Sequence, residues 1–167
     1  MLRNKLLLLY SWLIWFATFF IPDTGITMRF RGFLYSLAMK KSGKNLQVSS
    51  GTKLYGLNSI TVGDNVYIAT NVVINAGGCI DIGSEVLIGI GAIIVSGNHT
   101  IKNGSYRFGT PQQKTITIGF GSWIAAGVVL VAGSSIPNSS LVTPNSVIYK
   151  TLDLPGIYSG SSIRKIK

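Results

Sequence analysis

Aliphatic residues recur at every sixth position along much of the chain. Near the C-terminus the spacing is kept without a break at Ile118, Ile124, Leu130, Ile136, Val142 and Ile148. A period of six matches neither an α-helix nor the alternation of a half-buried strand. It predicts short strands joined by sharp bends, three of which close one triangular coil, with coils stacked at the strand spacing of about 4.8 Å. A β-sandwich with regular turns would have no reason to keep this phase.

The same period occurs earlier in the chain, in two shorter runs. The first consists of Val62, Ile68 and Ile74, and the second of Ile82, Ile88 and Ile94. The phase slips by two residues between these runs, near Gly77 and Gly78. Residues 100–115, TIKNGSYRFGTPQQKT, are polar and interrupt the pattern altogether. Because a long polar loop inside a repeat fold is usually functional, we expect this loop to cover a binding site.

The N-terminal segment has a different pattern. Residues 6–21 carry no charge, and a helix of this length would be about 24 Å long against a bilayer core of about 30 Å. Residues 26–39 mix apolar side chains with Arg29 and Arg31, and Lys40, Lys41 and Lys44 follow. Apolar and basic residues mixed in this way predict interfacial or re-entrant helices on an anionic membrane. A signal peptide would require a small-residue cleavage site, which is missing; a helix of the soluble core or of a trimer contact is the other alternative.

The charge distribution supports this division of the chain. The 167 residues include 15 Lys and Arg but 5 Asp and Glu, for a net charge of +10. Residues 1–47 carry a net charge of +6 and residues 148–167 a net charge of +3. The segment between them, residues 48–147, is therefore almost neutral. No basic stripe interleaved with aromatic residues is present, which argues against nucleic acid as a partner. We therefore expect membrane-associated helices in 1–47, a repeat domain in 48–150 and a basic tail in 151–167.

Some site chemistries are excluded by counting. One Cys and one His rule out a disulfide framework, a Cys-based zinc site and a metal centre of three histidines from one chain. No metal is expected. No GxSxG sequence is present either, which argues against a covalent acyl-enzyme on such an elbow.

Three short sequences resemble elements of a known family. Residues 118–124 read IGFGSWI, residues 147–150 read VIYK, and residues 155–164 read PGIYSGSSIR. With the hexad repeat, they resemble the hexapeptide-repeat acyltransferases, which fold as a left-handed parallel β-helix, and in particular their galactoside and maltose acetyltransferase branch. The chain departs from that pattern at Ala125, where the family usually has Gly, and at residues 161–163. In layout, the N-terminal helices are similar to those of the polysaccharide O-acetyltransferases of capsule, colanic acid and lipopolysaccharide pathways.

The resemblance implies an all-β enzyme that moves an acetyl group from acetyl-CoA to a sugar hydroxyl of a bacterial cell-surface polysaccharide or its lipid-linked precursor. It also implies a homotrimer, with the active site between neighbouring chains, at the cytoplasmic face of the bacterial inner membrane. Two alternatives stay open. One is an N-acetyltransferase acting on an amino-sugar nucleotide, and the other is a non-catalytic β-helix scaffold at the membrane.

The transfer needs a base that removes the hydroxyl proton, and a histidine titrates near neutral pH. His99 is the single histidine, and the resemblance assigns it this role. With a coil of eighteen residues, Asp81 would lie directly beneath His99 and could orient the imidazole. Asn75 is another candidate for the coil below, where related enzymes hold the acceptor sugar.

The remaining site residues also follow from the resemblance. It assigns six positions to acetyl-CoA: Trp123, Ala126, Pro144, Lys150, Arg164 and Lys167. Of these, Ala126 would offer a backbone N–H to the thioester carbonyl, and the basic residues would meet the nucleotide and its phosphates. In the polar loop, Tyr106 and Phe108 could stack on a sugar ring and Arg107 could bind an anionic sugar.

Overall fold

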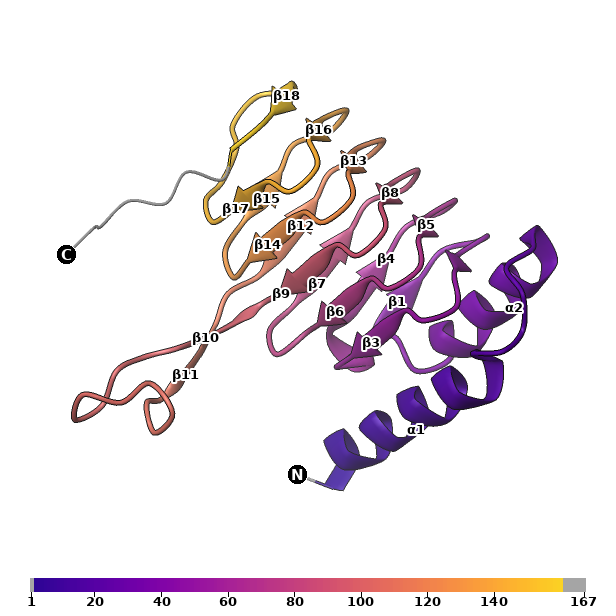
Figure 1. The fold of residues 1–167 in the computed structure, drawn as a ribbon, viewed down its shortest axis with the longest axis horizontal. Coiled ribbons are helices and arrows are strands. Elements are labelled where there is room, and N and C mark those ends of the chain that lie inside the picture. The colour runs from indigo at the N-terminus through magenta and orange to yellow at the C-terminus, as the bar shows by residue number, and fades with distance from the viewer. Residues whose placement is uncertain (1, 161–167) are drawn as a thin grey trace.

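The computed structural model describes residues 2–160 as two helices followed by a parallel β-helix (Figure 1). The coils are built from three parallel sheets, which we call A, B and C. Sheet A contains β1 (Lys41–Ser42), β4 (Ile60–Val62), β7 (Ile80–Ile82), β12 (Ile116–Ile118) and β15 (Ser135–Ile136). Sheet B contains β2 (Gln47–Val48), β5 (Tyr67–Ile68), β8 (Leu87–Ile88), β13 (Trp123–Ile124), β16 (Leu141–Val142) and β18 (Ile157–Tyr158). Sheet C contains β3 (Lys53–Tyr55), β6 (Val73–Asn75), β9 (Ile93–Val95), β14 (Val129–Val131) and β17 (Val147–Ile148). The predicted fold, a left-handed parallel β-helix of hexapeptide repeats, is confirmed.

The aliphatic residues of the repeat fill the inside of the coil. Ile68, Ile88 and Ile124 are fully buried and stack in register, one above the next, along sheet B. Leu54 and Ile74 begin an equivalent buried ladder in sheet C. Strand residues alternate between the two sides of a sheet, so each inward aliphatic residue places its strand neighbours on the outer surface.

The coils differ in length, and this difference accounts for the slip in the sequence pattern. Thr61 pairs with Asp81, so the early coils repeat every 20 residues. Thr117 pairs with Ser135, so the later coils repeat every 18. The two extra residues of the early coils lie at the bend from sheet C to the next strand of sheet A, which we call the C–A corner. In the first coil this corner holds the short 3-10 helix η1 (Leu57–Ser59).

The two helices close the N-terminal end of the β-helix (Figure 1). α1 (Leu2–Thr18) packs against β3, and α2 (Gly25–Ser36) packs against β2. Thr24 caps α2 through reciprocal hydrogen bonds with Thr27, which satisfy backbone donors at the helix start. α2 also requires a glycine, because a Cβ on Gly32 would overlap the carbonyl oxygen of Leu46.

Buried Arg31 ties the helices to the first coil. Its guanidinium donates hydrogen bonds to the carbonyl oxygen of Val48 at 2.6 Å and to the carbonyl oxygens of Thr18 and Ile21 at 3.1 Å. It also forms an ion pair with Asp23, with 3.0 Å between Nη1 and Oδ1. One side chain therefore joins α2, the end of α1 and β2, and satisfies main-chain carbonyls that would otherwise lose their hydrogen bonds on burial.

The opposite sides of the helices are apolar and exposed. α1 has 17 residues, and neither it nor any other helix in the described part of the chain is long and apolar enough to cross a bilayer. Its exposed apolar side chains include Leu2, Leu6, Leu13 and Phe16, and those of α2 include Ile26, Phe30 and Phe33. Contiguous apolar surface of this kind marks an interaction site.

Replacing Arg31 should separate the helices from the β-helix. We expect R31M to lower the free energy of unfolding by about 3 kcal/mol, because it leaves buried carbonyl groups without their hydrogen-bond donor and removes the ion pair with Asp23. The measurement is urea denaturation at a fixed protein concentration. The matched control is R29M, which makes the same change at an exposed position of the same helix. Equal urea midpoints for the two variants would contradict the anchoring role.

Candidate active site

A β-hairpin leaves the β-helix at the C–A corner after β9 and carries His99 (Figure 1). Its strands are β10 (Gly97–His99) and β11 (Pro111–Gln113), which pair antiparallel with His99 opposite Pro111. In sheet A, the strand before the hairpin pairs directly with the strand after it. Asp81 pairs with Thr117, although the two residues are 36 positions apart in the sequence. The hairpin is therefore an insertion at one corner that leaves the inward register of the coil unchanged.

Ser96 fixes the root of the hairpin. Its hydroxyl accepts a hydrogen bond from the N–H of Gly78 and donates to the carbonyl of Gly78, both at 2.9 Å. Its main chain donates to the carbonyl of Asn75 at 3.2 Å and accepts from the N–H of Lys114 at 3.0 Å. The buried serine thus clamps both strands of the hairpin to the corner of the coil below.

His99 itself is exposed, on a strand that projects beyond the coil. The prediction that Asp81 lies directly beneath it is wrong. Asp81 is on sheet A, between Thr61 below and Thr117 above, whereas His99 pairs with Pro111 within the hairpin. The prediction assumed an 18-residue coil, but the coils on either side of Asp81 have 20 and 36 residues. Asp81 instead lines a shallow groove on sheet A, of about 520 Å³.

Asn75 lies closer to the root of the hairpin. It is exposed at the end of β6 and pairs with Val95, the last residue of β9 before the hairpin begins. Among residues 2–160, no side chain forms a hydrogen bond with the His99 imidazole. Asn75 therefore lies in the coil below the hairpin, as expected. Within residues 2–160 of one chain, no side chain orients the His99 imidazole.

The tip of the hairpin presents the three side chains expected to meet a sugar. Tyr106, Arg107 and Phe108 are all exposed. The Arg107 guanidinium lies 5.8 Å from the centre of the Phe108 ring, which is a cation–π distance. A flat aromatic face beside a cation suits a saccharide that carries negative charge.

The residues assigned to acetyl-CoA lie elsewhere on the coil. Trp123 is on the outer face of sheet B, between Leu87 and Leu141, and 49% of it is exposed. Ala126 and Pro144 are exposed at the bend between sheets B and C. The Ala126 carbonyl accepts from the N–H of Asn145 at 3.0 Å, while its own N–H donates to no group in residues 2–160. That N–H is available to an incoming oxygen.

The basic residues of this set are only partly described. Lys150 is exposed after β17, at the C–A corner. Arg164 and Lys167 lie outside the described residues. Within one chain, the fold therefore does not bring His99 together with Trp123 and Ala126, because these residues occupy different corners of the triangular coil.

Sequence reasoning missed the role of Ser96. The signal available was a serine four positions before the polar loop, but many serines occur in this repeat. Its partner, Gly78, could be identified only once the 20-residue coil length was known.

Comparisons with known proteins place this geometry in context. No family model matches the sequence. In sequence, the chain is 29% identical over 136 residues to the putative colanic acid biosynthesis acetyltransferase WcaF of Escherichia coli K12, a match that covers 81% of this chain and 73% of WcaF. It is 30% identical over 113 residues to the putative acetyltransferase YJL218W of Saccharomyces cerevisiae, over 68% of this chain and 57% of that protein.

The fold is shared with solved acetyltransferases. A hexapeptide-repeat acetyltransferase from Vibrio cholerae in complex with acetyl-CoA matches with a TM-score of 0.82 and 23% identity, over 99% of this chain and 88% of that one. A galactoside acetyltransferase in complex with coenzyme A matches with a TM-score of 0.80 and 22% identity, over 98% and 82%. At these identities the structures establish the fold. The resemblance to hexapeptide-repeat acetyltransferases is confirmed, and acyltransferase is the enzyme class of these relatives and neighbours.

Removing the Ser96 hydroxyl should loosen the hairpin without unfolding the coil. Because S96A loses a buried pair of hydrogen bonds worth about 1 kcal/mol, we expect about fivefold faster trypsin cleavage after Lys102 and Arg107. The control is S134A, since the Ser134 hydroxyl is buried with no hydrogen-bond partner among the described residues. If both variants are cleaved at the wild-type rate, Ser96 does not hold the hairpin.

Proposed function

We propose that this chain, a β-helix protein of the hexapeptide-repeat type, is an acetyl-CoA-dependent O-acetyltransferase. Its acceptor would be a sugar hydroxyl of a bacterial cell-surface polysaccharide or of the lipid-linked precursor. The observation that carries the proposal is the hairpin, which holds the single histidine of the chain on a projecting strand with a cationic and aromatic tip. The likeness to a colanic acid acetyltransferase supports the choice of acceptor.

The proposed reaction is a direct transfer between two bound substrates. His99 accepts the proton of the sugar hydroxyl as the hydroxyl oxygen attacks the carbonyl carbon of the thioester. The N–H of Ala126 stabilises the oxygen that becomes negative in the tetrahedral intermediate. When that intermediate collapses, the carbon–sulfur bond breaks, the ester is formed and coenzyme A leaves as a thiol with the proton from His99.

Acetyl-CoA would lie along the bend between sheets B and C. Trp123 would line this groove, and Pro144 lies one coil above Ala126. Lys150, at the C–A corner, would reach the phosphates of a nucleotide bound along the bend of a neighbouring copy, as a point charge. Arg164 and Lys167, which follow the described chain, would add positive charge there.

A homotrimer would complete the site. The outer face of sheet A is polar, with Thr61, Asp81, Thr117 and Ser135. Beyond the first coil, each of the other two sheets carries an apolar row on its outer face: sheet B presents Tyr67, Leu87, Trp123 and Leu141, and sheet C presents Val73, Ile93, Val129 and Val147. Two apolar faces per chain fit a closed ring, in which each copy contacts two neighbours. Such a ring can set the hairpin of one copy beside Trp123 of the next.

A membrane surface would be the second partner. The exposed apolar residues of α1 and α2 lie in the segment with a net charge of +6. Apolar insertion combined with attraction to anionic lipids binds helices of this kind to an interface. We place the enzyme at the cytoplasmic face of the bacterial inner membrane, where lipid-linked saccharides would be within its reach.

Loss of the base should remove turnover and leave cofactor binding. With lipid-linked oligosaccharide acceptors, we expect H99A to lower kcat for thiol release from acetyl-CoA by about 10²–10⁴-fold, the usual contribution of a general base. Its Kd for acetyl-CoA should stay at the wild-type value. N98A, at the exposed neighbouring position of the same strand, is the control and should keep the wild-type rate. A fully active H99A would disprove the assigned base, and absence of acetyl-CoA binding in the wild type would favour the scaffold alternative.

A glutamate on the apolar face of sheet C and another on the apolar face of α1 should test trimer formation and membrane binding independently. V129E, on sheet C, should convert a trimer of three 17.9 kDa chains into monomers in sedimentation velocity and leave vesicle binding intact. L13E, on α1, should weaken binding to phosphatidylglycerol vesicles about tenfold and leave the trimer intact, because it places a charge in the lipid-facing surface. Each variant is the control for the other. A wild-type monomer, or vesicle binding unaffected by L13E, would refute the corresponding surface.

A further inference from the structure

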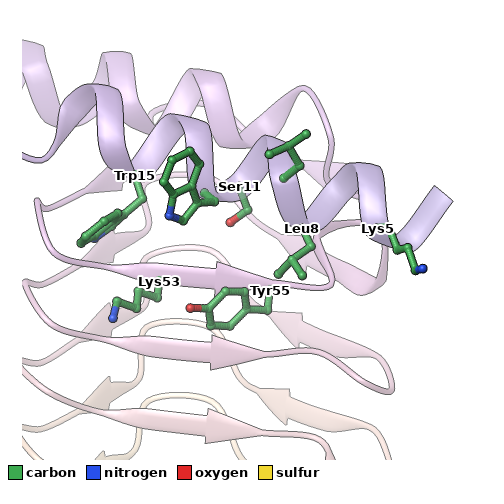
Figure 2. Close-up of a pocket in the computed structure, with 8 residues that line it drawn as sticks. Lys5, Leu8, Ser11, Trp15, Lys53 and Tyr55 are labelled. Atoms are coloured by element: carbon green, nitrogen blue, oxygen red, sulfur yellow. The ribbon is translucent and has the colours of Figure 1, made fainter. Parts of the chain in front are cut away.

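A cavity of about 460 Å³ lies beside the contact between α1 and the first strand of sheet C (Figure 2). Its lining includes Lys5, Leu8, Trp12, Trp15, Lys53 and Tyr55. Figure 2 shows Trp15 above Lys53 and Leu8 above Tyr55, so that the helix forms one wall and the outer side of β3 forms the other. The volume is within the range of about 300–1,000 Å³ that is usual for small-molecule sites.

The walls combine hydrocarbon with positive charge. Two lysines and no carboxylate are among the residues that line the cavity. The Lys53 ammonium lies 5.4 Å from the centre of the Trp15 ring, a cation–π contact that holds the charge at the cavity wall. Lysine binds phosphate as a point charge. The lining is therefore complementary to a single hydrocarbon chain that ends in a phosphate.

The cavity is also aligned with the hairpin that carries His99. Tyr55 pairs with Asn75, and Asn75 pairs with Val95, directly before the hairpin. Two strand spacings of about 4.8 Å separate Tyr55 from Val95, so the Tyr55 end of the cavity lies about 10 Å below the root of the hairpin. A sugar attached to a phosphate in the cavity can span this distance.

We propose that this cavity binds the isoprenoid phosphate of a lipid-linked saccharide and so presents the saccharide to the hairpin. The inference rests on the proposed function and names its acceptor class. An isoprenoid phosphate has one chain, which suits one cavity, and its sugar is joined to the phosphate that Lys53, at the Trp15 end of the cavity, would hold. The rest of the chain would continue from the cavity along the exposed apolar side of α1. Lys53 acts here as a positioning residue, and no bond is made or broken in the cavity.

Direct binding tests the site without reference to catalysis. Full-length protein is titrated with farnesyl phosphate in a calorimeter, with farnesol and lysophosphatidylglycerol as comparison ligands. We expect farnesyl phosphate to bind about tenfold more tightly than farnesol, because farnesol lacks the charge that the lysines attract. Lysophosphatidylglycerol that binds as tightly would identify the cavity as a membrane-lipid site and overturn the proposal. No binding of farnesyl phosphate would overturn it as well.

Two substitutions test whether farnesyl phosphate binds in the cavity. K53Q removes a cation and L8W fills the apolar space, and each should weaken farnesyl phosphate binding about tenfold. The matched control is K41Q, which removes one positive charge from the same N-terminal region at an exposed residue outside the cavity. Equal weakening by K41Q and K53Q would show general electrostatic attraction instead of a site, and would overturn the proposal.

Enzyme kinetics can distinguish an error in the proposed lipid-phosphate site from an error in the proposed transferase function. K53Q should raise KM for a polyprenyl-linked saccharide about tenfold and leave KM for the same saccharide without the lipid unchanged. If KM for the lipid-linked acceptor is the same in K53Q and wild type, the site is refuted and the transferase stands. If farnesyl phosphate binds in a Lys53-dependent manner but no acceptor is acetylated, the lipid-phosphate site stands and the proposed enzyme function is refuted.

Discussion

The stacked aliphatic side chains inside the coil fix the position of every other residue. A buried isoleucine contributes about 1.5–3 kcal/mol relative to an exposed one, and Ile68, Ile88 and Ile124 repeat this contribution coil after coil. Shifting one strand by a single residue would turn its aliphatic side chain outward and a polar one inward. The core therefore enforces one register, and that register determines which side chains line each outer face.

A β-helix must also protect its ends, because an uncovered terminal coil exposes both unpaired strand edges and apolar side chains. Here α1 and α2 cover the N-terminal end, and Arg31 satisfies the carbonyl of Val48 in the terminal coil. Closing the end with helices has a second consequence. Because α1 spans the end of the coil beside β3, it encloses the cavity whose opposite wall carries Lys53 and Tyr55.

The sequence pattern predicted the fold well because one physical requirement, an aliphatic side chain at each inward position, repeats along the chain. It predicted the site less completely. A period of six locates the inward residues but not the length of each corner. The error for Asp81 arose from additional chain at the C–A corner, both the two extra residues of the early coils and the hairpin that carries His99 off the coil. The clamp between Ser96 and Gly78 depends on the same corner. The cavity depends on how α1 docks, and no periodicity in the sequence encodes that docking.

The C–A corner can accept additional chain because sheet A resumes its pairing in register beyond it. The hairpin enters and leaves at this corner, and Ile80, Ile82, Ile116 and Ile118 still pair across it as if nothing were inserted. Closing a loop of this length costs little more entropy than closing a short one, and the Ser96 hydrogen bonds offset part of that cost. The inward side of the sequence is therefore constrained by packing, whereas the corners are free to vary. That freedom explains why the hairpin that carries His99 can leave the β-helix at this corner without disturbing the coils on either side.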